Sequence, residues 1–245
     1  MINIGWLYPD LMSTYGDRGN VITLVYRMQK RGLEAQVVKI SLNESPGLIS
    51  RMDMIFMGGA QDKQQEIVNK DLKANKGLFL KKAVEGGIPG LFVCGAYQFL
   101  GRYYKAADGT IIDGIGIFDL YTESPGINSQ RLIGNLIVEP YILPKTRLVG
   151  FENHGGRTHL GKKVTPLAKV IKGFGNNGED KNEGMVYKNS IGTYLHGPIL
   201  PKNPDLADWI IKKTLEKKTG EKVSLKKLDD TFENKAKQVI IERYL

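Results

Sequence analysis

The first hundred residues alternate between short apolar runs and stretches in which apolar positions recur at helical spacing. The apolar runs cover residues 1–8, 35–40, 53–59 and 89–95, and helical spacing covers residues 18–31, 61–73 and 76–86. Strands that are apolar at nearly every position are typical of parallel sheets buried between helices. Alternating strands and helices predict right-handed crossovers. We therefore expect an α/β fold with a mostly parallel sheet and helices on both faces.

The pattern changes near residue 110, where short strand-like segments are divided by glycine, asparagine and proline turns. The expected strands are 114–122, 131–139, 148–153, 163–171, 184–189 and 190–197, and the expected helices are 204–219 and 229–243. These short segments favour an antiparallel arrangement of the C-terminal half. No repeat or low-complexity linker separates the halves, so we expect residues 1–245 to form a single domain.

The composition is that of a globular protein, with 41% hydrophobic and 25% charged residues. A single cysteine excludes an internal disulfide and fits a reducing compartment. No apolar run approaches the ~20 residues that span a bilayer, and the first residues do not resemble a signal peptide. We therefore expect a cytoplasmic protein. The net charge of +9 is typical of lysine-rich helices that face solvent, and it could also serve to bind an acidic partner. The sequence contains no nucleic-acid-binding motif, so the charge does not by itself predict nucleic-acid binding.

The one cysteine, Cys94, stands where the apolar run 89–95 gives way to a segment that can begin a helix. Ligands of open α/β sheets bind beyond the carboxyl ends of the strands. A strand–residue–helix turn exposes a nucleophile there, and the helix N-terminus favours the thiolate. The small residues Gly95 and Ala96 allow a close approach. The alternative interpretation is a buried cysteine that acts as a small hydrophobic residue.

A thiolate nucleophile needs a proton partner, for which histidine is the usual choice. The three histidines are His154 and His159, in or near a turn after a strand-like segment, and His196, which ends an apolar run before a Gly-Pro turn. A histidine at a strand end is often a structural hydrogen-bonding residue. The strand-end position that it shares with Cys94 nevertheless strengthens the case for His196 as that partner.

Several segments together resemble a known family. The segment VCGAYQFLG resembles the nucleophile motif of class I glutamine amidotransferases, which have a flavodoxin-like fold. The other matching segments are YGDRGN, FMGGAQD, FDLYTES, GFENHGGRT, GFGNNGEDKNEG and GTYLHGPILPKN, in the family's order. They are similar to the cobyric-acid-synthase-like branch and, within it, to the glutaminase subunits of lipid II isoglutaminyl synthases.

The resemblance implies that this chain is a glutaminase. The Cys94 thiolate would attack the side-chain amide of glutamine, and backbone N–H groups near Gly59 and Gly95 would stabilise the oxyanion. His196 would protonate the departing ammonia and then activate water against the thioester.

Two further residues are candidates for substrate binding. Arg131 matches a family position implicated in glutamine handling, and arginine can bind a carboxylate through two hydrogen bonds. Without the resemblance, a surface salt bridge would be the preferred interpretation. Gln98 lies one helical turn after Cys94 and could line the pocket or make a local polar contact.

The sequence departs from the triad pattern at Pro198, where triad members of the superfamily carry the glutamate that orients the histidine. Either a Cys–His dyad operates or another carboxylate serves, and Glu152 is a candidate by its motif. A second departure is Ala96, where the wider family often has glycine. Alanine is tolerated there if its φ is negative.

The resemblance also implies a partner. Free ammonia is lost to water, so the chain would form a heterodimer with a MurT-like, Mur-ligase-related subunit that amidates D-glutamate of lipid II to D-isoglutamine in peptidoglycan synthesis. ATP and Mg would bind the partner, because the glycine-rich segments here lack the spacing of a phosphate-binding loop. We expect no cofactor or metal in this chain. The alternatives are a subunit for another ATP-dependent synthetase of the cobyric-acid type, a non-catalytic regulatory module, and a cysteine peptidase or other acyl hydrolase.

Overall fold

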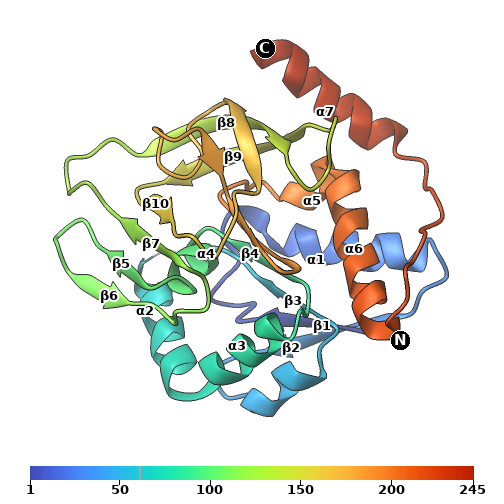
Figure 1. Cartoon of the computed structure of the whole chain (residues 1–245), viewed down its shortest axis with the longest axis horizontal. Coiled ribbons are helices and arrows are strands. Elements are labelled where there is room, and N and C mark those ends of the chain that lie inside the picture. The colour runs from blue at the N-terminus through green and yellow to red at the C-terminus, as the bar shows by residue number, and fades with distance from the viewer. Residues whose placement is uncertain (61) are drawn as a thin grey trace.

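A six-stranded sheet forms the centre of the computed structural model, which describes residues 1–60 and 62–245 (Figure 1). The strands run in the order β13-β14-β4-β3-β1-β2, and all neighbours pair in parallel except β13, which is antiparallel to β14. Their bounds are β1 (Ile2–Leu7), β2 (Ala35–Ile40), β3 (Met54–Met57), β4 (Gly90–Val93), β13 (Met185–Tyr187) and β14 (Ser190–Thr193).

Helices cover both faces of this sheet. One face packs against α1 (Arg18–Gln29) and α6 (Pro204–Thr219), and the other against α2 (Asp62–Asp71) and α3 (Gly77–Glu85). A single π-helical turn, Leu72–Lys76, joins α2 to α3. The remaining helices are the short α4 (Gly95–Phe99) and α5 (Ile199–Lys202), the C-terminal α7 (Thr231–Tyr244), and the 3-10 helices Thr14–Gly16 and Pro46–Arg51.

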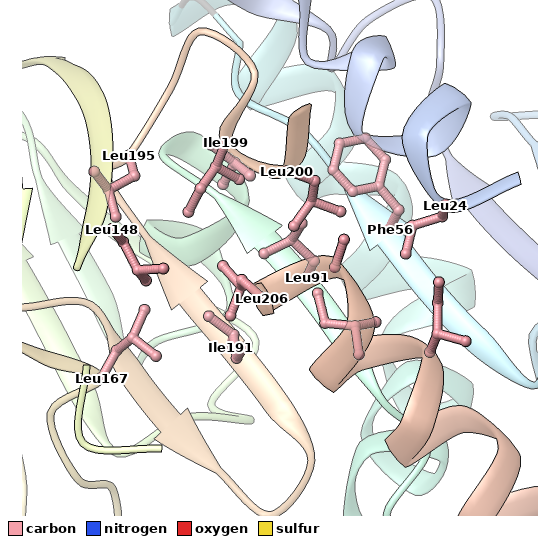
Figure 2. Close-up of a cluster of buried hydrophobic side chains, with 14 of the residues drawn as sticks. Leu24, Phe56, Leu91, Leu148, Leu167, Ile191, Leu195, Ile199, Leu200 and Leu206 are labelled. Atoms are coloured by element: carbon pink, nitrogen blue, oxygen red, sulfur yellow. The ribbon is translucent and has the colours of Figure 1, made fainter. Parts of the chain in front are cut away.

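Successive side chains along the buried strands point to opposite faces of the sheet, so the hydrophobic core consists of one cluster on each face. Every residue of β3 and β4 is buried. Phe56 and Leu91 point toward the α1 and α6 face, where they join Leu24 and Leu206 (Figure 2). Their neighbours along the strands, such as Ile55 and Phe92, belong to the cluster that packs under α2 and α3. The strands are apolar throughout because both of their faces are covered.

Two smaller four-stranded sheets are built from the middle of the chain. One has the order β10-β7-β5-β6 and the other β12-β11-β8-β9, and all pairs are antiparallel except β5 with β7. Their bounds are β5 (Tyr103–Lys105), β6 (Ile111–Asp113), β7 (Leu120–Glu123), β8 (Leu132–Pro140), β9 (Leu148–His154), β10 (Arg157–Leu160), β11 (Ala168–Lys172) and β12 (Asn182–Glu183).

The predicted α/β class with helices on both faces is confirmed, and three local predictions need correction. The expected strand 114–122 is wrong in its first part. Gly114, Ile115 and Phe118 donate backbone hydrogen bonds to residues 99–102 at the end of α4, and β7 begins only at Leu120.

The C-terminal half is not wholly antiparallel, since β14 enters the main sheet parallel to β4. The sequence pattern also missed β5, β6, β10 and β12. Gln61, the first residue of a predicted helix, lies outside the described residues.

Candidate active site

Cys94 occupies the turn between β4 and α4. Its backbone has φ of 51° and ψ of −106°, a conformation that L-residues rarely adopt. Two hydrogen bonds hold it, because the Cys94 N–H donates to the Thr193 carbonyl at 2.9 Å and the Cys94 carbonyl accepts from Gln98 N–H at 3.0 Å. A strained backbone of this kind costs roughly 1–3 kcal/mol and persists where its surroundings impose it. The turn presents the thiol at the carboxyl end of the sheet.

His196 approaches the same point from the end of the β14 segment. Its backbone exchanges two hydrogen bonds with Phe151 of β9, at 2.8 and 3.2 Å, and its side chain is fully buried. The next residue, Gly197, turns the chain with φ of 96°. Gly59 lies between the two side chains, since a Cβ added to it would be 3.1 Å from His196 Cε1 and 3.2 Å from Cys94 Cβ. The structure therefore brings Cys94 and His196 together.

Asp17 stands on the other side of the imidazole. Its Oδ1 lies 3.4 Å from His196 Nδ1, and its Oδ2 accepts the Gly59 N–H at 2.8 Å. The carboxylate is fully buried. With Nδ1 turned to this carboxylate, Nε2 is the ring nitrogen left for Cys94, and Nε2 makes no hydrogen bond among the described residues. Asp17 thus orients the ring for a proton exchange with the thiol.

The electrostatics of the site favour a protonated His196. Burial alone would lower the pKa of the His196 imidazole, but the negative charges of the Cys94 thiolate and Asp17 outweigh it and raise the pKa to about 10. The raised pKa favours the imidazolium form of His196 at neutral pH. An imidazolium beside a cysteine is an acid that is ready to protonate a leaving group.

A cavity of about 760 Å³ opens over Cys94, within the usual range for a small-molecule site. Arg131 lies on its wall, where its Nε donates to Asn153 Oδ1 at 2.8 Å and its Nη2 donates to the Asn153 carbonyl at 3.0 Å. Gln98 also lines the cavity, and its Nε2 donates to the buried Tyr194 hydroxyl at 3.0 Å. The cavity thus places a thiol and a guanidinium on one surface.

Gly95 and Gly59 are the two glycines next to the nucleophile. Gly95 has no room for a side chain, because an added Cβ would be 2.7 Å from Gln65 Nε2 and 3.4 Å from Ala60 N. The Gly59 N–H is already donated to Asp17. The expected role of amides near Gly59 and Gly95 in stabilising an oxyanion stays a prediction, and the Gly59 N–H would have to leave Asp17 to take part in it.

Comparison with known proteins agrees with this geometry. Residues 3–204 match the model of the CobB/CobQ-like glutamine amidotransferase domain. The chain belongs to this family. It is 45% identical, over 96% of its length and 92% of the relative's, to the lipid II isoglutaminyl synthase (glutamine-hydrolyzing) subunit GatD of Staphylococcus aureus (strain N315). It is 39% identical, over 99% of its length and 90% of the relative's, to the protein of the same name from Streptococcus pneumoniae (strain ATCC BAA-255 / R6). A solved glutamine amidotransferase shares the fold with a TM-score of 0.58 and 15% identity, over 86% of this chain and 98% of that one.

Within this amidotransferase domain, Glu152 is not the carboxylate that faces His196. Its Oε1 and Oε2 accept the backbone N–H groups of Phe174 and Gly175, at 2.7 and 2.9 Å. Its nearest ring is His154, whose Nε2 lies 3.6 Å from Oε2. The proposal of Glu152 as the orienting group is therefore wrong, because β9 directs this carboxylate toward the 173–175 loop.

The remaining histidines of the amidotransferase domain also have structural surroundings. His154 stacks on Tyr194 with ring centroids 3.6 Å apart, and burial lowers its pKa. His159 stacks on Tyr121 at 5.1 Å. Ala96 lies inside α4, so alanine is accommodated there in ordinary helical backbone.

Asp17 is the residue of this site that sequence reasoning missed. The signal was present, because YGDRGN was among the segments that resemble the family. The spacing could not reveal its role, since nothing in it indicates that a residue before α1 would reach a histidine 179 positions later.

The described residues hold no group of three or more His, Cys, Asp or Glu side chains arranged to bind a metal ion. No helix in the described part of the chain is long and apolar enough to cross a membrane.

Proposed function

We propose that this chain hydrolyses L-glutamine to glutamate and ammonia through a thioester at Cys94. The observation that carries the proposal is the meeting of Cys94, His196 and Asp17 around Gly59, beside a cavity that Cys94 and Arg131 both line. Family membership and the names of the relatives support the same reaction.

The reaction begins with attack of the Cys94 thiolate on the side-chain amide carbon of glutamine. Backbone amides near Gly59 and Gly95 stabilise the oxyanion, and such a donor contributes about 3 kcal/mol to lowering the barrier. His196 gives its Nε2 proton to the departing nitrogen, so that the C–N bond breaks, ammonia leaves and a γ-glutamyl thioester remains.

Hydrolysis of the thioester restores the enzyme. His196, now neutral at Nε2, takes a proton from a water molecule as the water oxygen attacks the thioester carbon. The C–S bond breaks, the thiolate is regenerated beside the imidazolium, and glutamate leaves. Asp17 holds Nδ1 through both steps and is thus a positioning residue.

Arg131 supplies the group that selects glutamine. Its guanidinium can bind the α-carboxylate, while the side-chain amide extends toward Cys94. Asn153 holds two of its nitrogens in place, which reduces the cost of ordering the side chain on binding.

The ammonia passes to a second subunit. The two relatives are named as subunits of a lipid II isoglutaminyl synthase. By analogy, the partner of this chain is a MurT-like ligase in the cytoplasm that binds ATP and Mg and converts D-glutamate of lipid II to D-isoglutamine. We assign no cofactor to this chain itself.

The complex of this chain with its ligase partner tests the proposal. With glutamine as the nitrogen donor, Cys94→Ala should abolish amidation of lipid II, a loss of about a thousandfold or more, because Cys94 is the only cysteine in the sequence. With ammonium chloride as the donor, the same variant should retain wild-type amidation. Glutamine-driven amidation by Cys94→Ala would refute the assignment.

A matched pair of histidine variants provides the control. His196→Ala should lose glutaminase activity, whereas His159→Ala, which changes a ring stacked on Tyr121 away from the thiol, should retain it. Equal losses in both variants would indicate a general folding defect and not a role for His196.

A further inference from the structure

Tyr15 occupies an unusual position beside the active-site histidine. Its ring packs edge-on against the His196 ring, with centroids 5.0 Å apart and an interplanar angle of 75°. The tyrosine is 46% exposed and lines the cavity, whereas the histidine that it covers is fully buried. Tyr15 therefore forms part of the barrier between His196 and solvent.

The backbone of Tyr15 is strained. Its φ of 56° and ψ of 27° fall in the left-handed region, which is costly for a bulky residue. An exposed tyrosine gains little stability from burial to offset this cost. The strain is consistent with a position fixed by function, and the same short segment carries Asp17, which holds the opposite side of the imidazole.

A chain of hydrogen bonds connects Tyr15 to the substrate-binding wall. The Tyr15 hydroxyl accepts a hydrogen bond from Asn153 Nδ2 at 2.7 Å. The Asn153 side-chain and main-chain oxygens in turn accept from Nε and Nη2 of Arg131. One amide side chain therefore contacts both the guanidinium and the tyrosine that covers His196.

We propose that Tyr15 is a positioning residue that couples carboxylate binding at Arg131 to the orientation of the His196 ring. The inference rests on the proposed function. A carboxylate bound to Arg131 fixes Asn153, and Asn153 fixes the Tyr15 hydroxyl. The tyrosine ring then holds His196 with Nδ1 on Asp17 and Nε2 on Cys94. We call this series of contacts, from Arg131 through Asn153 and Tyr15 to His196, the relay. A ligand without the carboxylate leaves the tyrosine ring unfixed, so the relay favours glutamine over simple amides.

Two substitutions separate the hydroxyl from the ring. Tyr15→Phe keeps the ring and removes the hydroxyl. It should raise the KM for glutamine about fivefold, the effect of one ordinary hydrogen bond, and should also lower kcat, because Asn153 no longer fixes the ring over His196. Tyr15→Ala removes the cover of His196 and should lower kcat about tenfold or more. Tyr26→Phe, on the exposed side of α1, is the matched control and should behave as wild type.

A pH profile distinguishes positioning from general stability. The groups that face His196 are Asp17, Cys94 and Tyr15. The raised pKa of His196 depends on the charges of the first two acting on a buried ring. In Tyr15→Ala, water can reach the His196 ring and screen those charges, so the pKa of His196 falls toward its ordinary value. Because His196 must be protonated to act as the acid, the alkaline limb of the kcat/KM profile then moves to lower pH. A structural defect alone would lower activity without moving this limb.

A double-mutant cycle tests the relay itself. If the hydroxyl acts through Asn153, then Tyr15→Phe combined with Asn153→Ala should raise KM no more than Asn153→Ala alone. Additive effects would refute the relay, and a wild-type pH profile and wild-type kinetics in both Tyr15 variants would refute the proposal as a whole. Thermal unfolding of each variant controls for folding.

The proposed function can fail separately from this inference. Wild-type protein, assayed with its ligase partner, would then release no ammonia from glutamine. In that case the rate of Cys94 alkylation by iodoacetamide still reports on the contact, because this is the only thiol in the chain. The alkylation rate should change in Tyr15→Ala and not in Tyr26→Phe, and equal rates would refute the role of Tyr15.

Discussion

At the residue scale, Asp17 decides how the histidine can act. One of its oxygens faces His196 Nδ1 and the other holds the backbone of Gly59, the residue over which Cys94 and His196 meet. The carboxylate thus orients the base and anchors the loop beside it. This arrangement supplies from the N-terminal segment what Pro198 cannot supply two residues after the histidine.

Asp17→Asn should lower kcat/KM for glutamine by about a hundredfold or more. The asparagine amide can present Nδ2 to His196, which would make Nδ1 an acceptor and put the ring in the wrong tautomer. Loss of the negative charge also lowers the raised pKa of His196, so the alkaline limb should move to lower pH. Steady-state kinetics across pH measures both effects. Asp10→Asn, at an exposed position, is the control, and unchanged kinetics in Asp17→Asn would exclude the positioning role.

At the element scale, the turn from β4 into α4 stores strain that a substitution can release. Glycine adopts a φ of 51° without the penalty that a side chain incurs. Cys94→Gly should therefore unfold at higher urea concentration than Cys94→Ala, with a difference of about 1 kcal/mol in the free energy of unfolding. Both variants lack the thiol, so this comparison isolates the backbone. A more stable alanine variant would show that the turn is not strained.

The elements around the site also explain what the sequence could predict. The strand-to-helix turn at Cys94 is encoded locally, by an apolar run followed by small residues, and the resemblance then made His196 its partner. Asp17 could not be found in this way, because its role arises from the packing of a segment before α1 against the end of β14. The failed strand at 114–119 has the same cause, since its backbone bonds to the end of α4 and not to a strand.

At the scale of the whole molecule, a buried carboxyl group behind the site links stability to pH. Glu183 of β12 is fully buried, and its Oε1 accepts from the Thr193 hydroxyl at 2.5 Å and from the Tyr194 N–H at 2.9 Å. Its Oε2 has no partner among the described residues. Burial raises the pKa of this group to about 7, so the folded protein keeps a proton that the unfolded chain has lost.

This difference destabilises the wild type as pH rises from about 4.5 to 7, because the folded state then binds more protons than the unfolded state. Glu183→Gln cannot ionise. The stability of the wild type relative to this variant should therefore fall by about 3 kcal/mol across the window, following 1.36 kcal/mol per pKa unit. The contributions of His154 and His196 are common to both proteins and cancel. Urea unfolding at several pH values measures the difference, and parallel stability curves would contradict it.

The insertion of β14 beside β4 has a consequence for how the protein is made. The ribosome releases the nucleophile strand long before residues 190–196, which complete its hydrogen bonding and deliver the histidine. Until then, one edge of the apolar β4 has no neighbour, which is the kind of exposed edge that pairs with other chains. A nascent chain therefore carries a thiol without its histidine and an aggregation-prone edge at the same time. Translation of one short C-terminal segment resolves both, so that reactivity and solubility are acquired in the same folding step.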